Sequence, residues 1–109
     1  MTRGGRLQEY ARRAMAELQF EWDEAKAAGN LEKHGVTFDE ASSVFRDPLA
    51  KVVPDPTDPS GEDRAIMMGH SDQGLLLLIV FTERADRIRI INAREATRRE
   101  RHGYEEESE

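Results

Sequence analysis

The chain of 109 residues contains no cysteine, which excludes disulfides, thiolate nucleophiles and cysteine metal sites and makes a reducing cytoplasm the expected location. It also has no apolar run long enough to cross a membrane, because the longest extends only from Leu75 to Phe81. The first ten residues, MTRGGRLQEY, hold no apolar segment of the kind that a secretory signal needs. The sequence therefore predicts one cytoplasmic domain with no membrane partner.

Motifs for cofactor and metal chemistry are missing as well. The sequence has no glycine-rich phosphate loop, nucleophile elbow or serine-triad pattern. The histidines, His34, His70 and His102, are far apart, and none has a second ligand three or four residues away on a clear helix face. The carboxylates of residues 55–63 resemble an acidic loop more than a spaced calcium loop. We therefore expect neither a metal nor a cofactor.

The charge of the chain is unevenly distributed. The whole chain carries −6, but the window from Arg84 to His102 holds seven arginines against three carboxylates, a net +4, so the remaining residues sum to −10. Arginine grips planar or tetrahedral anions with a bidentate fork. Such a cationic zone predicts binding to a phosphate backbone or an acidic partner. The alternative is a solvated face whose arginines pair with surface carboxylates at little gain in stability.

The amino-terminal half predicts two short helices. Asp23 is a good N-cap for the first, which is expected to end at Gly35, a residue suited to the left-handed position after a helix. Thr37 and Glu40 form a capping-box pattern for the second, which should stop before Pro48. Trp22 and Phe38 are expected to anchor the core, after a brief extended segment at residues 20–22.

The half after residue 48 predicts β-structure and one last helix. Strands are expected at residues 49–53, 64–69, 75–82 and 87–92, and most of their links are too short for parallel crossovers, so the pairing should be antiparallel. The third strand, LLLLIVF, is apolar on both faces, which indicates a central strand covered on both sides. Thr97 and Glu100 form a second capping box, and the helix should run through Tyr104. The predicted fold is thus α+β, with two helices, an antiparallel sheet of about four strands and a carboxy-terminal helix.

Two terminal segments lie outside this predicted domain of residues 20–104. Residues 1–19 form an extension that is partly helical, with an apolar stripe of Leu7, Tyr10, Ala14 and Leu18 at helical spacing. We expect the stripe to pack on the domain or on a second copy of the chain, which would give a homodimer. Residues 105–109 form an acidic tail that should fray.

Two sets of polar side chains are candidates for binding. In the first helix, spacing places one set on a single side, away from Ala25, Ala28 and Leu31, and a solvated face is the favoured interpretation; this set is Lys26, Asn30, Lys33 and His34. On the last strand, alternation directs Arg87 and Arg89 to one face and the intervening isoleucines to the other. We expect Arg84, Arg94 and Arg98 to converge with them at one corner of the sheet.

Three segments of the chain resemble the BrnT family, whose members are toxins of type II toxin–antitoxin modules regarded as RelE-like ribonucleases. The segments are FEWDEAKAAGNLEKHGVTFDEASSVFRDPLA (residues 20–50), EDRAIMMGHS (62–71) and RIRIINAREATRRERHGY (87–104). The resemblance covers most of the chain and implies a RelE-like fold. It also implies a metal-independent endoribonuclease that inhibits translation, neutralised by a BrnA-like antitoxin, with operator DNA contacted only through the toxin–antitoxin complex.

Within this resemblance, a ribonuclease without a metal needs a base for the RNA 2′-hydroxyl, charge stabilisation at phosphorus and an acid for the leaving oxygen. For phosphate contact we assign Arg64, Arg89 and Arg94, supported by Arg84 and Arg98; for proton transfer, Glu83, His34 or Lys33; and for further RNA contact, Lys26 and Lys33. The opposing hypothesis is a non-catalytic binding module or co-repressor, in which the same arginines dock an antitoxin tail or operator phosphates.

Overall fold

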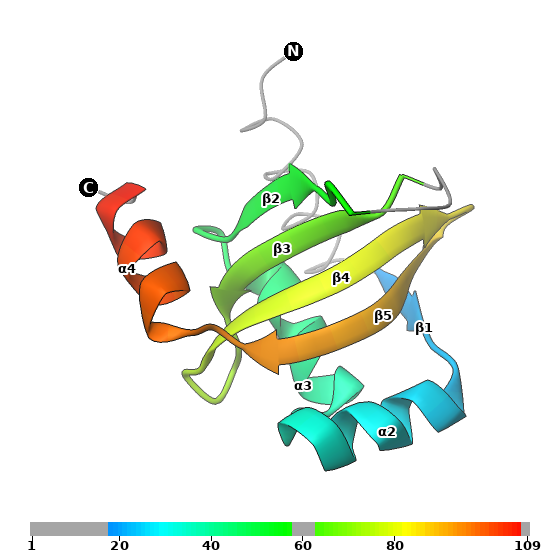
Figure 1. Ribbon diagram of the computed structural model, residues 1–109. Coiled ribbons are helices and arrows are strands. Elements are labelled where there is room, and N and C mark those ends of the chain that lie inside the picture. The colour runs from blue at the N-terminus through cyan, green and yellow to red at the C-terminus, as the bar shows by residue number, and fades with distance from the viewer. Residues whose placement is uncertain (1–17, 58–62, 108–109) are drawn as a thin grey trace.

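A five-stranded sheet with the strand order β1-β5-β4-β3-β2 organises the computed structural model, which describes residues 18–57 and 63–107 (Figure 1). Its strands are β1 (Gln19–Glu21), β2 (Lys51–Pro54), β3 (Ala65–His70), β4 (Leu76–Arg84) and β5 (Arg87–Glu95). β2 to β5 form antiparallel neighbours, as predicted, whereas β1 pairs with β5 in parallel. The extended segment at residues 20–22 therefore adds a fifth strand and makes the sheet mixed. The helical part of the predicted extension falls in residues 1–17, outside the described residues.

The two predicted amino-terminal helices are α2 (Glu24–His34) and α3 (Phe38–Ser43), and α3 continues into a 3-10 turn, η1 (Val44–Arg46). Asp23 caps α2 by accepting the Lys26 N–H at 2.9 Å, and Gly35 ends it at φ 71°. The Thr37 hydroxyl accepts the Glu40 N–H at 3.0 Å. These local predictions are confirmed, because a cap depends on residues only a few positions apart.

α2 and α3 pack on one face of the sheet and enclose the core. Its aromatic centre is Phe45, whose ring lies 5.1 Å from that of Phe20 and 5.0 Å from that of Phe81, both edge-on. Trp22 packs edge-on against Phe38 at 5.9 Å, and Phe38 is buried, so both act as the predicted anchors. The same face of the strands supplies further buried side chains: Met67, Leu77, Ile79, Ile88, Ile90 and Ala93.

The prediction that Asn30 belongs to a solvated face of α2 is wrong. The side chain is 6% exposed, and its amide donates to the carbonyls of Val36 at 3.0 Å and Ala93 at 2.7 Å, while its oxygen accepts the Ala93 N–H at 3.1 Å. Leu31, predicted to lie on the buried side, is 48% exposed. Spacing had identified a polar stripe, but one member of it satisfies buried backbone groups of β5 and fixes α2 to the sheet.

The opposite face of the sheet, which α2 and α3 leave uncovered, is turned toward the viewer in Figure 1. We call it the open face; strand alternation assigns to it Lys51, Val53, Ile66, Met68, His70, Leu78, Val80, Arg89 and Arg94. The central strand β4 is buried on both sides, since Leu76 and Leu77 are 1% and 0% exposed, as predicted.

The last helix, α4 (Arg98–Glu107), stands at one end of the open face (Figure 1). Its capping box closes in both directions, with the Glu100 N–H donating to the Thr97 hydroxyl and the Thr97 N–H donating to the Glu100 carboxylate. Tyr104 is 7% exposed and donates its hydroxyl to the Leu49 carbonyl at 3.0 Å. The helix continues to Glu107, so residues 105–107 belong to α4, and the expectation that they fray is wrong. None of the described helices is long and apolar enough to span a membrane.

Candidate functional site

The arginines of β5 lie at two ends of the open face and not at one corner as expected. Arg89 pairs in register with Thr82, and Arg94 pairs with Leu78. These partners are four residues apart on β4, which corresponds to about 13 Å along the strand. One group therefore lies at the β4–β5 hairpin and the other lies beside α4. The expected corner is wrong because β5 runs through Glu95 and carries Arg94 to the far end.

The hairpin cluster consists of Arg64, Arg84, Arg87 and Arg89. Arg84 and Arg87 are exposed and directly opposite each other across the hairpin, an arrangement that is unfavourable between like charges unless an anion joins them. Arg89 is bound to Glu21 of β1 at 3.2 Å, with 34% of its side chain exposed. Arg64 directly precedes β3, so strand alternation directs it to the open face, level with Thr82. This group forms one cationic end of the face.

The α4 cluster consists of Arg94, Arg98, Arg99 and Arg101. Arg94 forms a bidentate pair with Glu100, with both N···O distances at 2.8 Å. The hydrogen bonds from Arg94 lower the pKa of Glu100 from 4.5 to about 2, and the same contact raises the pKa of Arg94. Because Glu100 also caps α4, this pair ties the end of β5 to the start of the helix. Arg94 thus has a structural partner in addition to any ligand.

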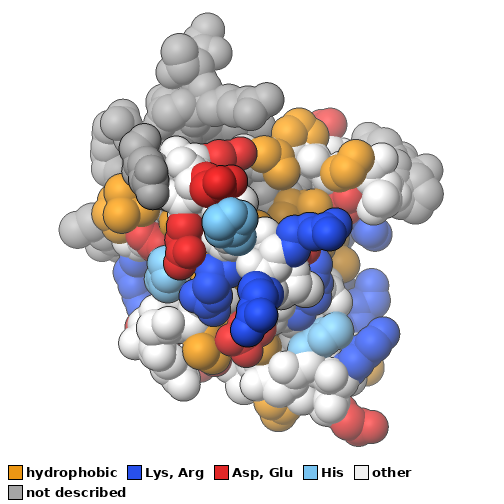
Figure 2. Space-filling model, turned by 60° about the vertical axis from the view of Figure 1, so that its left-hand side comes forward, with side chains coloured by type: hydrophobic (Ala, Val, Ile, Leu, Met, Phe, Trp, Pro, Cys, Tyr) orange, Lys and Arg blue, Asp and Glu red, His pale blue; other side chains and the backbone are white. Residues whose placement is uncertain are grey.

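The other members of the α4 cluster are held loosely. Arg98 and Arg99 are exposed, and Arg101 lies 3.8 Å from Glu95, a long contact between half-exposed side chains. Figure 2, which looks toward this end of the molecule, shows Lys and Arg side chains gathered in a band with histidines at its borders and acidic side chains interleaved. The band can hold a polyanion, because loosely paired arginines exchange a carboxylate for a phosphate at little cost.

The remaining predicted residues do not join these clusters in a single site. Glu83 pairs with the buried Ile88 and so lies on the helix-covered side of β4, whereas the next residue, Arg84, lies on the open face. Lys26, Lys33 and His34 belong to α2, in the helical layer, with His34 half-buried and the lysines exposed. Since Asn30 fixes α2 to Ala93, the turn carrying Lys33 and His34 lies at the same end as Arg94 but on the other side of the sheet. The nine assigned residues are therefore split between two faces.

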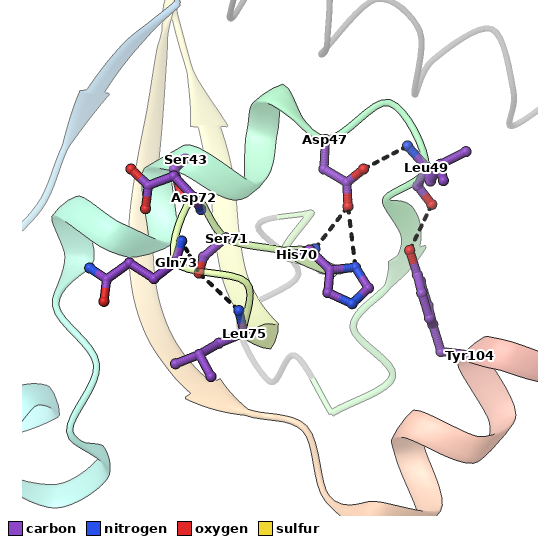
Figure 3. A network of polar contacts seen from close by, with 9 residues as sticks. All are labelled: Ser43, Asp47, Leu49, His70, Ser71, Asp72, Gln73, Leu75 and Tyr104. Carbon is purple, nitrogen blue, oxygen red and sulfur yellow. Dashed lines mark hydrogen bonds and ion pairs between the residues drawn. The ribbon is translucent and has the colours of Figure 1, made fainter.

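A histidine–carboxylate pair that sequence reasoning missed lies beside α4. Asp47, which follows η1, accepts the backbone N–H of His70 at 2.8 Å, and the Nδ1 atom of His70 lies 3.8 Å from the same carboxylate oxygen (Figure 3). The ring also packs edge-on against Tyr104, with centroids 5.9 Å apart. The two residues are 23 positions apart, so no local spacing could have indicated the pair.

The close approach of Asp47 to β3 depends on Gly69. A Cβ at this position would lie 2.7 Å from the Ala50 Cβ and 3.1 Å from the Asp47 carboxylate. Any other residue would push the η1 segment away from the strand. The glycine before the histidine is therefore the feature that allows Asp47 to reach His70.

The described ranges, 18–57 and 63–107, contain no group of three or more His, Asp or Glu side chains arranged to hold a metal ion. The chemistry that these ranges offer directly is that of guanidinium groups, carboxylates and imidazoles. Such groups can bind an anion, stabilise negative charge and transfer protons.

The fold and its two cationic clusters define a small α+β protein with an arginine-rich strand and a closing helix. The chain belongs to the BrnT family: the family described as "Ribonuclease toxin, BrnT, of type II toxin-antitoxin system" matches residues 22–100. Among solved structures, the 1.1 Å crystal structure of the Brucella abortus ribonuclease toxin BrnT is similar, with a TM-score of 0.59 and 24% identity, covering 74% of this chain and 99% of that one. At that identity the likeness concerns the fold. None of the curated proteins matches the chain. The resemblance noted in the sequence and the α+β fold are thus confirmed.

Proposed function

We propose that this chain is a metal-independent endoribonuclease that cleaves RNA, arrests translation in the cytoplasm and is neutralised by a BrnA-like antitoxin. The observation that carries the proposal, beside family membership, is the pair of arginine clusters on one face of the sheet. Their separation of about 13 Å spans more than one nucleotide of an extended strand. A single RNA strand laid along the open face would contact both clusters.

In this proposal the hairpin cluster binds RNA and the α4 cluster stabilises the reacting phosphate. Arg64, Arg84 and Arg89 hold backbone phosphates at one end, where the exposed guanidinium groups of Arg84 and Arg87 face each other across the hairpin. Arg94 and Arg98 supply charge stabilisation at the other end, which for one preorganised donor amounts to roughly a hundredfold or more in rate. The antitoxin would cover the same face, and operator DNA would be contacted through the complex with it.

For proton transfer, His34 is the most suitable of the residues that the sequence suggested. It lies one turn beyond Asn30, at the end of the molecule that carries Arg94, and it is half-buried. Glu83 lies at the hairpin end of β4, five residues from Leu78, the partner of Arg94, which argues against its acting on a phosphate held by the α4 cluster. Lys26 and Lys33 would extend RNA contact around the edge of the sheet to the helical layer.

The carboxylate partners of the arginines favour a second candidate, a non-catalytic binding module. Arg89 is bound to Glu21, Arg94 to Glu100 and, more loosely, Arg101 to Glu95. A module of this kind would exchange these carboxylates for those of an acidic antitoxin segment and would perform no chemistry.

Incubation of the purified protein with RNA in EDTA separates the two candidates. A ribonuclease of the proposed kind gives fragments with 2′,3′-cyclic phosphate and 5′-hydroxyl ends, whereas a module leaves RNA intact at high protein concentration, both free and on translating ribosomes. If both free RNA and RNA on translating ribosomes remain intact, the proposed ribonuclease activity is refuted.

Matched variants test the RNA track along the open face. Arg89→Gln should weaken RNA binding and reduce the slope of log K against log salt by about 1. Glu21→Gln removes only the carboxylate partner of Arg89, so binding should be equal or stronger. Arg46→Gln, an exposed arginine of η1 in the helical layer, is the control and should leave binding unchanged. Equal binding of RNA by Arg89→Gln and Arg46→Gln would refute the proposal that RNA lies along the open face.

A further inference from the structure

The imidazole of His70 has the surroundings of a catalytic base. Its Nδ1 side faces the Asp47 carboxylate, and its ring edge is held against Tyr104, so Nε2 lies on the far side of the ring from Asp47 (Figure 3). The side chain is 48% exposed while that of Asp47 is only 13% exposed. A carboxylate beside Nδ1 favours the tautomer with a proton there, which leaves Nε2 as the acceptor of this half-exposed ring.

Asp47 is itself fixed and needs no substrate to position it. One carboxylate oxygen accepts the Leu49 N–H at 2.9 Å and the other accepts the His70 N–H at 2.8 Å. Gly69 allows this approach, since a Cβ there would meet both Ala50 and Asp47. The arrangement follows the general pattern of a base oriented by a third group.

Cations needed for a phosphate lie on the helix that touches His70. Arg101 precedes Tyr104 by three residues, so the two are neighbours on the surface of α4. Within residues 18–57 and 63–107, the carboxylate that Arg101 contacts is that of Glu95, at 3.8 Å. On the other side, the Lys51 ammonium lies 4.9 Å from the centre of the Tyr104 ring. The groups that face the imidazole are thus Asp47 and Tyr104. Lys51 and Arg101 are neighbours of Tyr104.

From this geometry we infer that His70, oriented by Asp47, is the general base of RNA cleavage. This inference rests on the proposed function. Nε2 accepts the proton of the 2′-hydroxyl as the 2′-oxygen forms its bond to phosphorus and the bond from phosphorus to the 5′-oxygen breaks. The 5′-oxygen takes a proton from solvent, and the imidazolium returns its proton to solvent, so no co-reactant is consumed. Arg101 stabilises the charge on the non-bridging oxygens.

The test compares three single-histidine variants under single-turnover conditions over a range of pH, with RNA affinity and melting temperature measured alongside. His70→Gln should slow cleavage by about 10²–10⁴-fold, lose the acid limb of the pH–rate profile and keep its affinity for RNA. His102→Gln is the matched control, since His102 is 73% exposed and paired with Glu106 on α4. His34→Gln tests the base suggested by the sequence.

Two further variants separate catalysis from structure. Added imidazole should restore activity to His70→Ala, which a purely structural role would not allow. Asp47→Asn, a positioning variant, should lower kcat and leave KM unchanged. The inference fails if the parent cleaves RNA and His70→Gln cleaves at the parental rate, or if His34→Gln alone loses activity. A parent that leaves free and ribosome-bound RNA intact would instead overturn the proposed function, and this inference with it.

Discussion

The pair between Arg94 and Glu100 should make the stability of this protein depend on acid in a defined way. Glu100 accepts two arginine hydrogen bonds at 2.8 Å, which lower its pKa from 4.5 to about 2. A carboxylate with a lowered pKa in the folded state adds stability that is complete above the unfolded pKa and is lost as the pH falls through the folded one. The predicted window is therefore from about pH 4.5 down to about pH 2.

The magnitude follows from the shift and from the exposure of the pair. A fall from 4.5 to about 2 corresponds to about 3 kcal/mol if no screening occurs. Side-chain exposures of 35% for Arg94 and 29% for Glu100 allow solvent to screen the pair, so about 1–2 kcal/mol is the expected contribution at neutral pH. For a domain of this size that amounts to a melting temperature lower by about 5–10 °C in Glu100→Gln.

Thermal unfolding followed by circular dichroism from pH 7 to pH 3 measures this contribution. The difference between the parent and Glu100→Gln should be full at pH 7 and fall to about half or less by pH 3. Glu105→Gln makes the same charge change at an exposed position of α4 and serves as the control. If the two variants melt at the same temperature throughout, or if their difference does not change with pH, the reasoning is refuted.

Three other substitutions test the packing. Asn30→Ala removes three hydrogen bonds of 2.7–3.1 Å from a buried amide and leaves backbone groups unsatisfied, so urea unfolding should show a loss of about 2–4 kcal/mol; an unchanged midpoint would show that α2 is held by other contacts. In Gly69→Ala the new Cβ would lie 2.7 Å from that of Ala50, so the free energy of unfolding should fall by about 1–3 kcal/mol. In Gly29→Ala the new Cβ would meet open space on α2, so the free energy of unfolding should rise by about 0.5–1 kcal/mol. Melting temperatures that do not order the three proteins in this way would contradict the close approach at Gly69.

Local chemistry explains why much of the fold was predictable. Caps such as Asp23 and Thr37 act over three residues, and the alternation of arginine with isoleucine along β5 repeats every second residue, so both can be read from adjacent letters. The segment at residues 20–22 was harder, because its pairing partner Ile88 is distant in sequence and three residues carry little periodic signal. Parallel pairing across such a distance depends on tertiary packing.

The candidate site was only partly predictable for the same reason. The arginines could be named from the sequence, but their division into two clusters follows from the length and register of β5. Asn30 was assigned to a solvated stripe because helical spacing gives the side of a helix and not what packs against it. His70 was considered only as a metal ligand, since its partner Asp47 comes close through a loop that only the folded chain brings to β3.

The sequence by itself determined the helix ends, the strand alternation, the excess of arginine near the carboxy terminus and membership of the family, because each depends on residue identity and short spacing. Only the tertiary structure decided which arginine has which carboxylate, which polar residue is buried and which histidine has an oriented ring. Those outcomes depend on contacts between segments 6 to 68 positions apart, at distances that no local pattern encodes.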